Sequence, residues 1–177
     1  MKSKLMPSIV LGSICLVVAL LLSVVNMFTS DVIYEAEQKK IQAALEVVLP
    51  DCGEVDKVLD EYADGVFAKE IDEIFKAENG YVFQMTVKGY NTGMVVLVGI
   101  GNDGKITGTK CTTDSETPSK KDPVFAIVDG EGGKYVGMSG GNYSPILEVS
   151  GSTMTGTGYA NAVKTALDAY ALITGGE

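Results

Sequence analysis

The chain contains no histidine and no tryptophan, and only three of its 177 residues are cysteines. Histidine is the commonest metal ligand and the commonest general base, so its absence removes the simplest route to both roles. A Ser-His-Asp hydrolase built on Ser139 or Ser150 is therefore excluded. The cysteines, at 15, 52 and 111, are too few for an iron–sulfur cluster that takes four thiolates. The sequence leaves open whether Cys52 and Cys111 form a disulfide or stay free.

Positive charge is also scarce, and the formal net charge is −9. Such a balance argues against nucleic acid as a partner, because phosphates would be repelled. The acids are dense between residues 51 and 79, but they lack the alternating aspartate spacing and glycine of a calcium loop. We therefore expect them to form a solvated face.

One long apolar run covers residues 9–28 without a charged side chain. At about 1.5 Å per residue, such a helix reaches roughly 30 Å, the thickness of the hydrocarbon core. No small-residue cleavage site follows Leu22, so we predict a retained transmembrane helix. Lys2 and Lys4 precede the run and Asp31 follows it, which predicts a cytoplasmic N-terminus and an extracytoplasmic main domain.

The rest of the chain predicts an α+β fold with an antiparallel sheet and flanking helices. Apolar residues recur at helical spacing over residues 31–49, and Pro50 ends that helix. Residues 51–79 predict short helices or turns. A meander with one buried face is expected from strands at 81–87, 93–99 and 106–112, with a turn at 102–105. A turn or short helix at 122–126, a glycine-rich loop with weak strand character at 130–141 and a helix at 159–173 are expected to follow. The predicted organisation is a cytoplasmic N-terminus and transmembrane helix at 1–30, a helical connector at 31–78 and a functional domain at 79–177.

The segment from Ser150 to Thr155 packs hydroxyl groups around Gly151 just before the last predicted helix. Glycine allows close backbone approach, and a helix start offers unpaired N–H groups to an anion. A phosphate can be bound there, or esterified to one of the hydroxyls. The alternative is a turn rich in serine and threonine that only caps the helix.

These features stand in a recognisable order: a single span, a helix ending at Leu49-Pro50, a strand pair at 93–108, the tetrapeptide from Ser115 to Pro118, and the segment from Ser150 to Thr155. In this order the chain resembles the FMN-binding domain family. With its anchor it is similar to the G subunits of Rnf complexes, the ion-pumping ferredoxin:NAD oxidoreductases, and to the related C subunits of sodium-pumping NADH:quinone reductases. The resemblance is strongest from about Gly89 to Ala171.

The resemblance implies that FMN is joined through its phosphate to the hydroxyl of Thr153. Other residues expected to bind the cofactor come from the same segment and from the earlier tetrapeptide. They are Ser150, Gly151, Ser152, Met154, Thr155, Glu116, Thr117 and Pro118. No catalytic residue and no metal ligand is expected. Ser119, Lys120 and Lys121 stand where family members usually carry Gly-Leu-Gly. The two lysines are close enough to the tetrapeptide to offset negative charge on a reduced flavin, but we expect both to face solvent.

The resemblance further implies an electron-transfer subunit rather than a stand-alone enzyme. Electrons would arrive from a membrane-embedded iron–sulfur centre of partner subunits and leave to a second flavin-bearing membrane subunit. An FMN transferase would attach the cofactor. Ion movement would occur in the partners, since the span carries no ionisable residue. The alternatives are a free-standing extracytoplasmic flavoprotein and a non-redox cell-surface binding module.

Overall fold

The structure is a computed structural model that describes residues 2–62, 71–130, 132–147 and 149–175. The chain divides into two compact units, Met1–Lys40 and Ile41–Glu177. Helix α1 (Lys2–Val48) supplies the first unit and also the first residues of the second. The helix therefore continues from the predicted membrane segment into the predicted connector.

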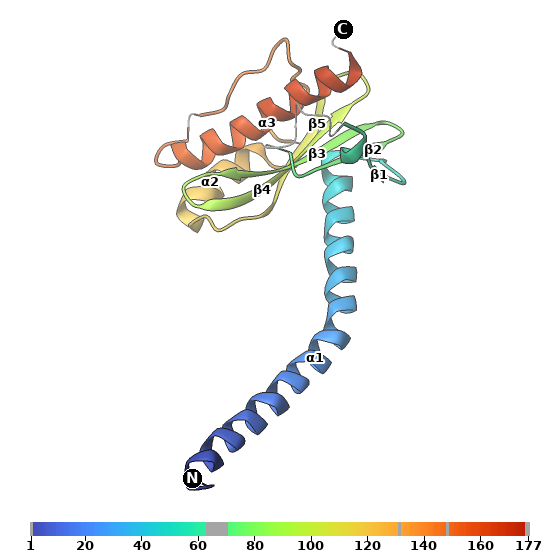
Figure 1. The fold of residues 1–177 in the computed structure, drawn as a ribbon. Coiled ribbons are helices and arrows are strands. Elements are labelled where there is room, and N and C mark those ends of the chain that lie inside the picture. The colour runs from blue at the N-terminus through green and yellow to red at the C-terminus, as the bar shows by residue number, and fades with distance from the viewer. Residues whose placement is uncertain (1, 63–70, 131, 148, 176–177) are drawn as a thin grey trace. The chain divides into compact units, whose positions relative to one another are not determined.

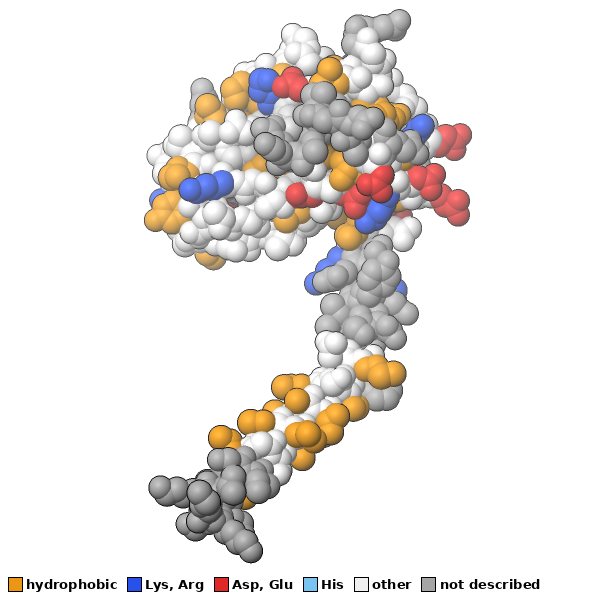
Figure 2. All heavy atoms as spheres, viewed as in Figure 1, with side chains coloured by type: hydrophobic (Ala, Val, Ile, Leu, Met, Phe, Trp, Pro, Cys, Tyr) orange, Lys and Arg blue, Asp and Glu red, His pale blue; other side chains and the backbone are white. Residues whose placement is uncertain are grey.

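Val10–Met27 of α1 is long and apolar enough to cross a membrane. Its large hydrophobic side chains are exposed, as the band of orange atoms in Figure 2 shows. Burying such a surface in lipid is favourable, whereas leaving it in water is costly. The segment fits a single-pass membrane protein, as the sequence predicts.

The second unit is built on a five-stranded sheet whose neighbouring strands are all antiparallel. The strands follow one another in the order of the chain, which gives a meander (Figure 1). Its elements are β1 (Asp56–Lys57), the 3-10 helix η1 (Leu59–Tyr62), β2 (Glu73–Ala77), β3 (Gly80–Lys88), β4 (Thr92–Gly101), β5 (Ile106–Thr113), α2 (Pro118–Val128) and α3 (Thr153–Thr174). The predicted α+β class and antiparallel sheet are confirmed.

The hairpin between β4 and β5 forms where the sequence predicts it. Gly104 takes a positive φ of 76°, which a glycine adopts without strain. The N–H of Gly101 donates to the carbonyl of Lys105 and closes the turn at 2.9 Å. This turn fixes the register that pairs Val98 with Thr109.

One face of the sheet is covered by α3 and α2. Met94, Val96 and Val98 alternate along β4 and join a single buried cluster with Val163 and Ala166 of α3. The small alanines of α3 allow the helix to lie close to the sheet, across which it runs in Figure 1. This packing determines where α3 begins relative to the strands.

The opposite face of the sheet is also partly buried. This corrects the prediction that only one face is buried. Leu45 and Val48, at the end of α1, form a second cluster with Leu97 of β4. Gly99 makes the contact possible, since a Cβ atom there would lie 2.1 Å from the carbonyl oxygen of Val48. The hydroxyl of Thr107 donates to the same carbonyl. The last turns of α1 are thus part of the folded domain.

Three other local predictions need correction. Residues 73–77 form strand β2 rather than a helix or turn, because Ile74 and Phe75 are buried on opposite faces of the sheet. The segment expected as a turn or short helix at 122–126 belongs to the longer helix α2, which begins at Pro118. The last helix begins at Thr153, six residues before the expected start, so half of the hydroxyl-rich segment is helical.

The three cysteines are free in this structure. Cys52 belongs to the cluster under α1, and Cys111 packs against the cluster under α3. Among the residues that the structure describes, no group of three or more cysteines, aspartates and glutamates is arranged to hold a metal ion.

Candidate functional site

The first turns of two helices are linked in the second unit, since Lys120 of α2 contacts Gly151, which lies just before α3. Thr117 is the residue before α2, and Ser152 is the residue before α3. Neither side chain caps its helix, and neither helix carries an acid in its first turn. The first N–H groups of a helix lack intrahelical acceptors and carry partial positive charge. The region is therefore suited to an anion.

A cavity of about 250 Å³ lies at this place. It is lined by residues 151–155, together with Tyr90 from the connection between β3 and β4 and Lys120 from α2. The fold thus brings together three segments that are distant in the sequence. Ser150 is exposed and does not line the cavity. Glu116, Thr117 and Pro118 do not line it either.

The turn before α3 depends on Gly151. Its φ is 77°, in the left-handed region that other residues rarely adopt. A Cβ atom at this position would lie 3.7 Å from the ammonium nitrogen of Lys120. Glycine is therefore required by the left-handed backbone of this turn, whereas the space beside Lys120 would admit a Cβ atom at an ordinary contact distance.

The hydroxyl of Ser152 is buried without a partner among the described residues. The side chain is 3% exposed. Buried hydroxyls are nearly always hydrogen-bonded, so this one, on a residue that lines the cavity, is suited to donate to a bound group. Thr153, the first residue of α3, lines the same cavity and is exposed. The hydroxyl of Ser152 is thus available to donate to a ligand, and the hydroxyl of Thr153 is accessible from solvent.

Glu116 is engaged by the protein itself. Its side chain is 6% exposed. One carboxylate oxygen accepts the N–H of Asn91 at 2.7 Å, and the other accepts the hydroxyl of Thr155 at 2.5 Å. Thr117 and Pro118 are exposed; Thr117 precedes α2, and Pro118 begins it, where the fixed φ of proline suits the first helical position.

Lys120 and Lys121 were both expected to face solvent, but each is held by a contact within the protein. The ammonium of Lys120 donates to the carbonyl oxygen of Gly151 at 2.8 Å. Lys121 contacts both carboxylate oxygens of Asp114 at 3.0 Å, and this bond raises the pKa of the lysine. Only Lys120 lines the cavity, so it is the cation available to an anion there.

Tyr90 and Asn91 were not singled out from the sequence, and Lys120 was given no preference over Lys121. Tyr90 is an aromatic residue that is 56% exposed at the rim of the cavity, and Met154 is similarly exposed. The sequence feature that points to Lys120 is its position two residues after Pro118, which ends the tetrapeptide expected to bind the cofactor. No local pattern distinguishes it from Lys121, because the difference lies in contacts with distant segments.

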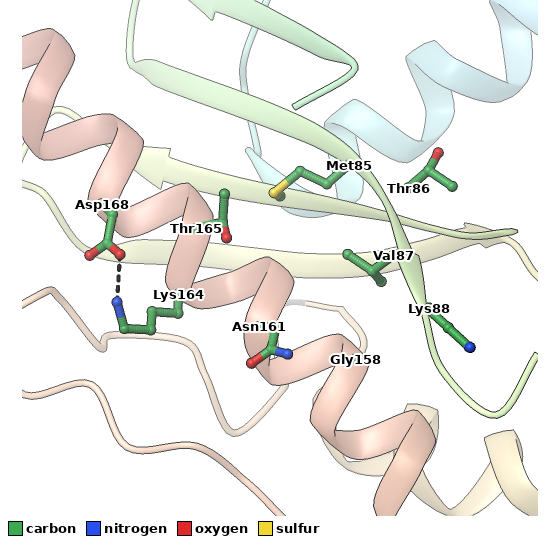
Figure 3. A pocket seen from close by; sticks show the side chains of 9 residues that line it. All are labelled: Met85, Thr86, Val87, Lys88, Gly158, Asn161, Lys164, Thr165 and Asp168. Atoms are coloured by element: carbon green, nitrogen blue, oxygen red, sulfur yellow. Dashed lines mark hydrogen bonds and ion pairs between the residues drawn. The ribbon is translucent and has the colours of Figure 1, made fainter. Parts of the chain in front are cut away.

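A larger groove of about 480 Å³ lies between β3 and α3 (Figure 3). Its walls are residues 85–88 of β3 and the side of α3 that carries Asn161, Lys164 and Asp168. Lys164 and Asp168 pair with each other at 2.6 Å, as the dashed line in Figure 3 shows. None of the residues expected to bind a cofactor lines this groove, so the smaller cavity is the better candidate.

Comparison with known proteins agrees with this choice. Residues 89–168 match the FMN-binding domain family, and the match contains both the Glu116 region and the start of α3. The chain is also 26% identical to the G subunit of the ion-translocating oxidoreductase complex of Shewanella piezotolerans (strain WP3 / JCM 13877). The alignment covers 93% of this chain and 88% of that protein.

The resemblance expected from the sequence is therefore confirmed: the chain is similar to FMN-binding domain proteins and to a component of an ion-translocating oxidoreductase complex. The family match supports FMN as the ligand.

Proposed function

From this similarity we propose that the chain is a membrane-anchored flavoprotein whose FMN is joined through its phosphate to the hydroxyl of Thr153. It relays electrons within an Rnf-type ferredoxin:NAD oxidoreductase coupled to ion translocation. The observation that carries the proposal is the start of α3. There an orphaned buried hydroxyl, an exposed hydroxyl and an ammonium group line one cavity.

The accessible hydroxyl is the better attachment point. Thr153 is exposed at the first position of α3, whereas Ser152 is buried. The oxygen of Thr153 would displace a leaving group from the phosphorus of an activated flavin nucleotide supplied by the transferase, so the bond to that group breaks and the hydroxyl proton is lost. The product then has the mass of the chain plus FMN less one water. The phosphodiester keeps one negative charge, which the helix start and Lys120 stabilise.

The residues around Thr153 have separate roles in holding that group. The hydroxyl of Ser152 donates to a phosphate oxygen, and Gly151 gives the backbone its close approach. Tyr90 and Met154 offer exposed apolar surface at the rim for the ring system. Bound FMN supplies the electron-accepting and electron-donating chemistry, while the protein binds and orients it.

We further propose the predicted organisation and orientation: residues 1–30 carry the N-terminus and span, 31–78 connect, and 79–177 bind FMN outside the cytoplasm. Two lysines before the span and acids after it support this orientation. The proposed partners are an iron–sulfur membrane subunit pair, a second flavin-bearing membrane subunit and an FMN transferase. Ions move in those partners, since Val10–Met27 contains no ionisable group apart from the thiol of Cys15.

The attachment is tested by producing the full chain together with an FMN transferase. The purified protein is denatured, separated on a gel and examined for flavin fluorescence, and its intact mass is measured. We expect a fluorescent band and one added FMN less a water in the wild type and in Ser152→Ala. We expect neither in Thr153→Ala. A fluorescent Thr153→Ala chain would move the bond elsewhere, and an unmodified wild type would overturn the proposal.

Co-purification distinguishes the proposed complex from a free-standing flavoprotein. The anchored chain is extracted from its native membrane in mild detergent. Iron–sulfur and second-flavin subunits should accompany it. A flavinylated chain that is recovered alone would favour the free-standing alternative, and a colourless chain would favour the non-redox surface module.

A further inference from the structure

The carboxylate of Glu116 joins three segments that meet only in the folded domain. Glu116 lies just before α2, Asn91 lies between β3 and β4, and Thr155 lies in the first turn of α3. The two partners are 25 and 39 residues away from Glu116 in the sequence. No other side chain of the site contacts both the strand connection and α3 through hydrogen bonds of the described residues.

This junction is buried and tightly packed. The side chains of Glu116 and Thr155 are 6% and 1% exposed. A Cβ atom on Gly89 would lie 2.7 Å from a carboxylate oxygen of Glu116 and 3.3 Å from the Cα of Thr155. A displacement of any one of the three segments would therefore break these contacts or shift the other two segments.

The hydroxyls of Ser152 and Thr155 differ in their hydrogen bonding. A hydroxyl has one proton, and that of Thr155 is donated to Glu116. The hydroxyl of Ser152 has no partner among the described residues and keeps its proton for a ligand. Because the acceptor is a carboxylate, the bond from Thr155 is of the stronger, charge-assisted kind.

The first turn of α3 has few other side-chain attachments within the described part of the chain. Ser152 makes no capping bond to the helix. Besides the Glu116–Thr155 bond, a second side-chain link runs from Lys120 to Gly151, and its lysine is partly exposed. The buried Glu116–Thr155 pair is thus the more rigid of the two.

We infer that Glu116 is a positioning residue. By binding Thr155 and Asn91 at once, it holds the first turn of α3 against the connection between β3 and β4 and so presents Thr153 for modification. This inference rests on the proposed function. It differs from the expectation that Glu116 binds the cofactor, because the carboxylate acts through Thr155.

The test replaces the hydroxyl of Thr155 and compares the result with an equally buried threonine elsewhere. Thr155→Val removes the bond to Glu116, whereas Thr155→Ser keeps it. Thr109→Val is the control, since the buried hydroxyl of Thr109 donates to the carbonyl of Val128, away from the cavity. The rate of FMN attachment is measured by intact mass over a series of chain concentrations with the FMN transferase.

We expect attachment to Thr155→Val to slow by about tenfold or more, as loss of a bond to a charged group implies. Thr155→Ser should recover most of the rate. Thr109→Val should attach FMN at the wild-type rate even if it melts earlier. Glu116→Ala should behave like Thr155→Val, and Glu116→Gln should be intermediate, because an amide oxygen still accepts from Asn91.

A second readout does not depend on the flavin. In the unmodified chain, amide hydrogen exchange in residues 153–158 should be faster in Thr155→Val than in Thr109→Val. If the wild type never takes up FMN, the proposed function fails, while the exchange comparison still tests the junction. If the wild type is modified and the two valine variants match in attachment and in exchange, the positioning role is overturned.

Discussion

The ammonium nitrogen of Lys120 lies 2.8 Å from the carbonyl oxygen of Gly151. This contact links the first turn of α2 to the turn that precedes α3. Its neighbour Lys121 is turned toward Asp114 instead. Two adjacent lysines therefore have different electrostatic tasks, and only one faces the proposed phosphate.

Lys120→Met should weaken FMN binding, because a cation beside the phosphate is lost. We expect roughly a threefold to tenfold increase in Kd, of the order that a half-exposed ionic contact provides. The measurement uses a Thr153→Ala background, so that only non-covalent binding is titrated. Lys121→Met is the matched control and should change Kd little. The effect should shrink at high salt, and equal effects of the two variants would contradict the assignment.

Gly158→Ala should destabilise the domain. A Cβ atom at this position would lie 2.4 Å from the carbonyl oxygen of Lys88, where neither backbone can yield easily. We expect a loss of about 1–3 kcal/mol in the free energy of unfolding. Thermal unfolding of the variant measures it.

Gly156→Ala is the control for that change, two residues earlier in α3. Its nearest contact would be the carbonyl oxygen of Ile146 at an ordinary 3.6 Å. Replacing a helical glycine by alanine is then neutral or stabilising by up to about 1 kcal/mol. A Gly158→Ala chain as stable as Gly156→Ala would contradict the close packing of α3 on β3.

Cys111 should be unreactive at neutral pH. Burial is the main cause that raises the pKa of its thiol to about 12, with Asp129 and Asp114 adding to it. Little thiolate is present at pH 7, so alkylation by iodoacetamide should be far slower than in the denatured chain. Peptide mapping of the labelled protein checks this. Rapid labelling of native Cys111 would contradict the buried environment.

The same thiol should make stability depend on pH in alkaline solution. The folded pKa is raised above the unfolded value of about 8.5, so the native state holds its proton more tightly. Its contribution is fully present below about pH 8.5 and is lost as pH rises toward about 12. The stability difference between wild type and Cys111→Ala should fall over this window. A difference independent of pH would argue against the shift.

The end of α1 should be required for the fold of the second unit. A fragment that begins at Ile41 retains Leu45 and Val48 and should fold, whereas one that begins at Pro50 exposes the cluster around Leu97. Removing several buried aliphatic side chains costs several kcal/mol, at about 1.5–3 kcal/mol each. Circular dichroism melting distinguishes the two fragments. In the full chain, Leu45→Ala should lose about 2–5 kcal/mol.

The local sequence pattern was sufficient to predict those elements that are stabilised by residues close together in the sequence. The alternation along β4, the glycine turn at residues 102–105 and the uninterrupted apolar run of α1 each act within a few residues, so their predictions are confirmed. The starts of α2 and α3 were predicted too late. Pro118 at the first position of α2 is a local start signal that the prediction did not use, whereas Thr153 begins α3 in a segment of Thr and Gly whose helix propensity is low.

By itself, the sequence determined an apolar helix of membrane-spanning length, an antiparallel sheet and a hydroxyl-rich segment suited to phosphate. Only the tertiary structure decided that Ser152 is orphaned among the described residues, that Glu116 is occupied by Asn91 and Thr155, and that Lys120 rather than Lys121 reaches the cavity. Strand and turn preferences are set by neighbouring residues. The task of a polar side chain is set by the partner it meets, and these partners come from segments that only the packing of α2 and α3 brings together.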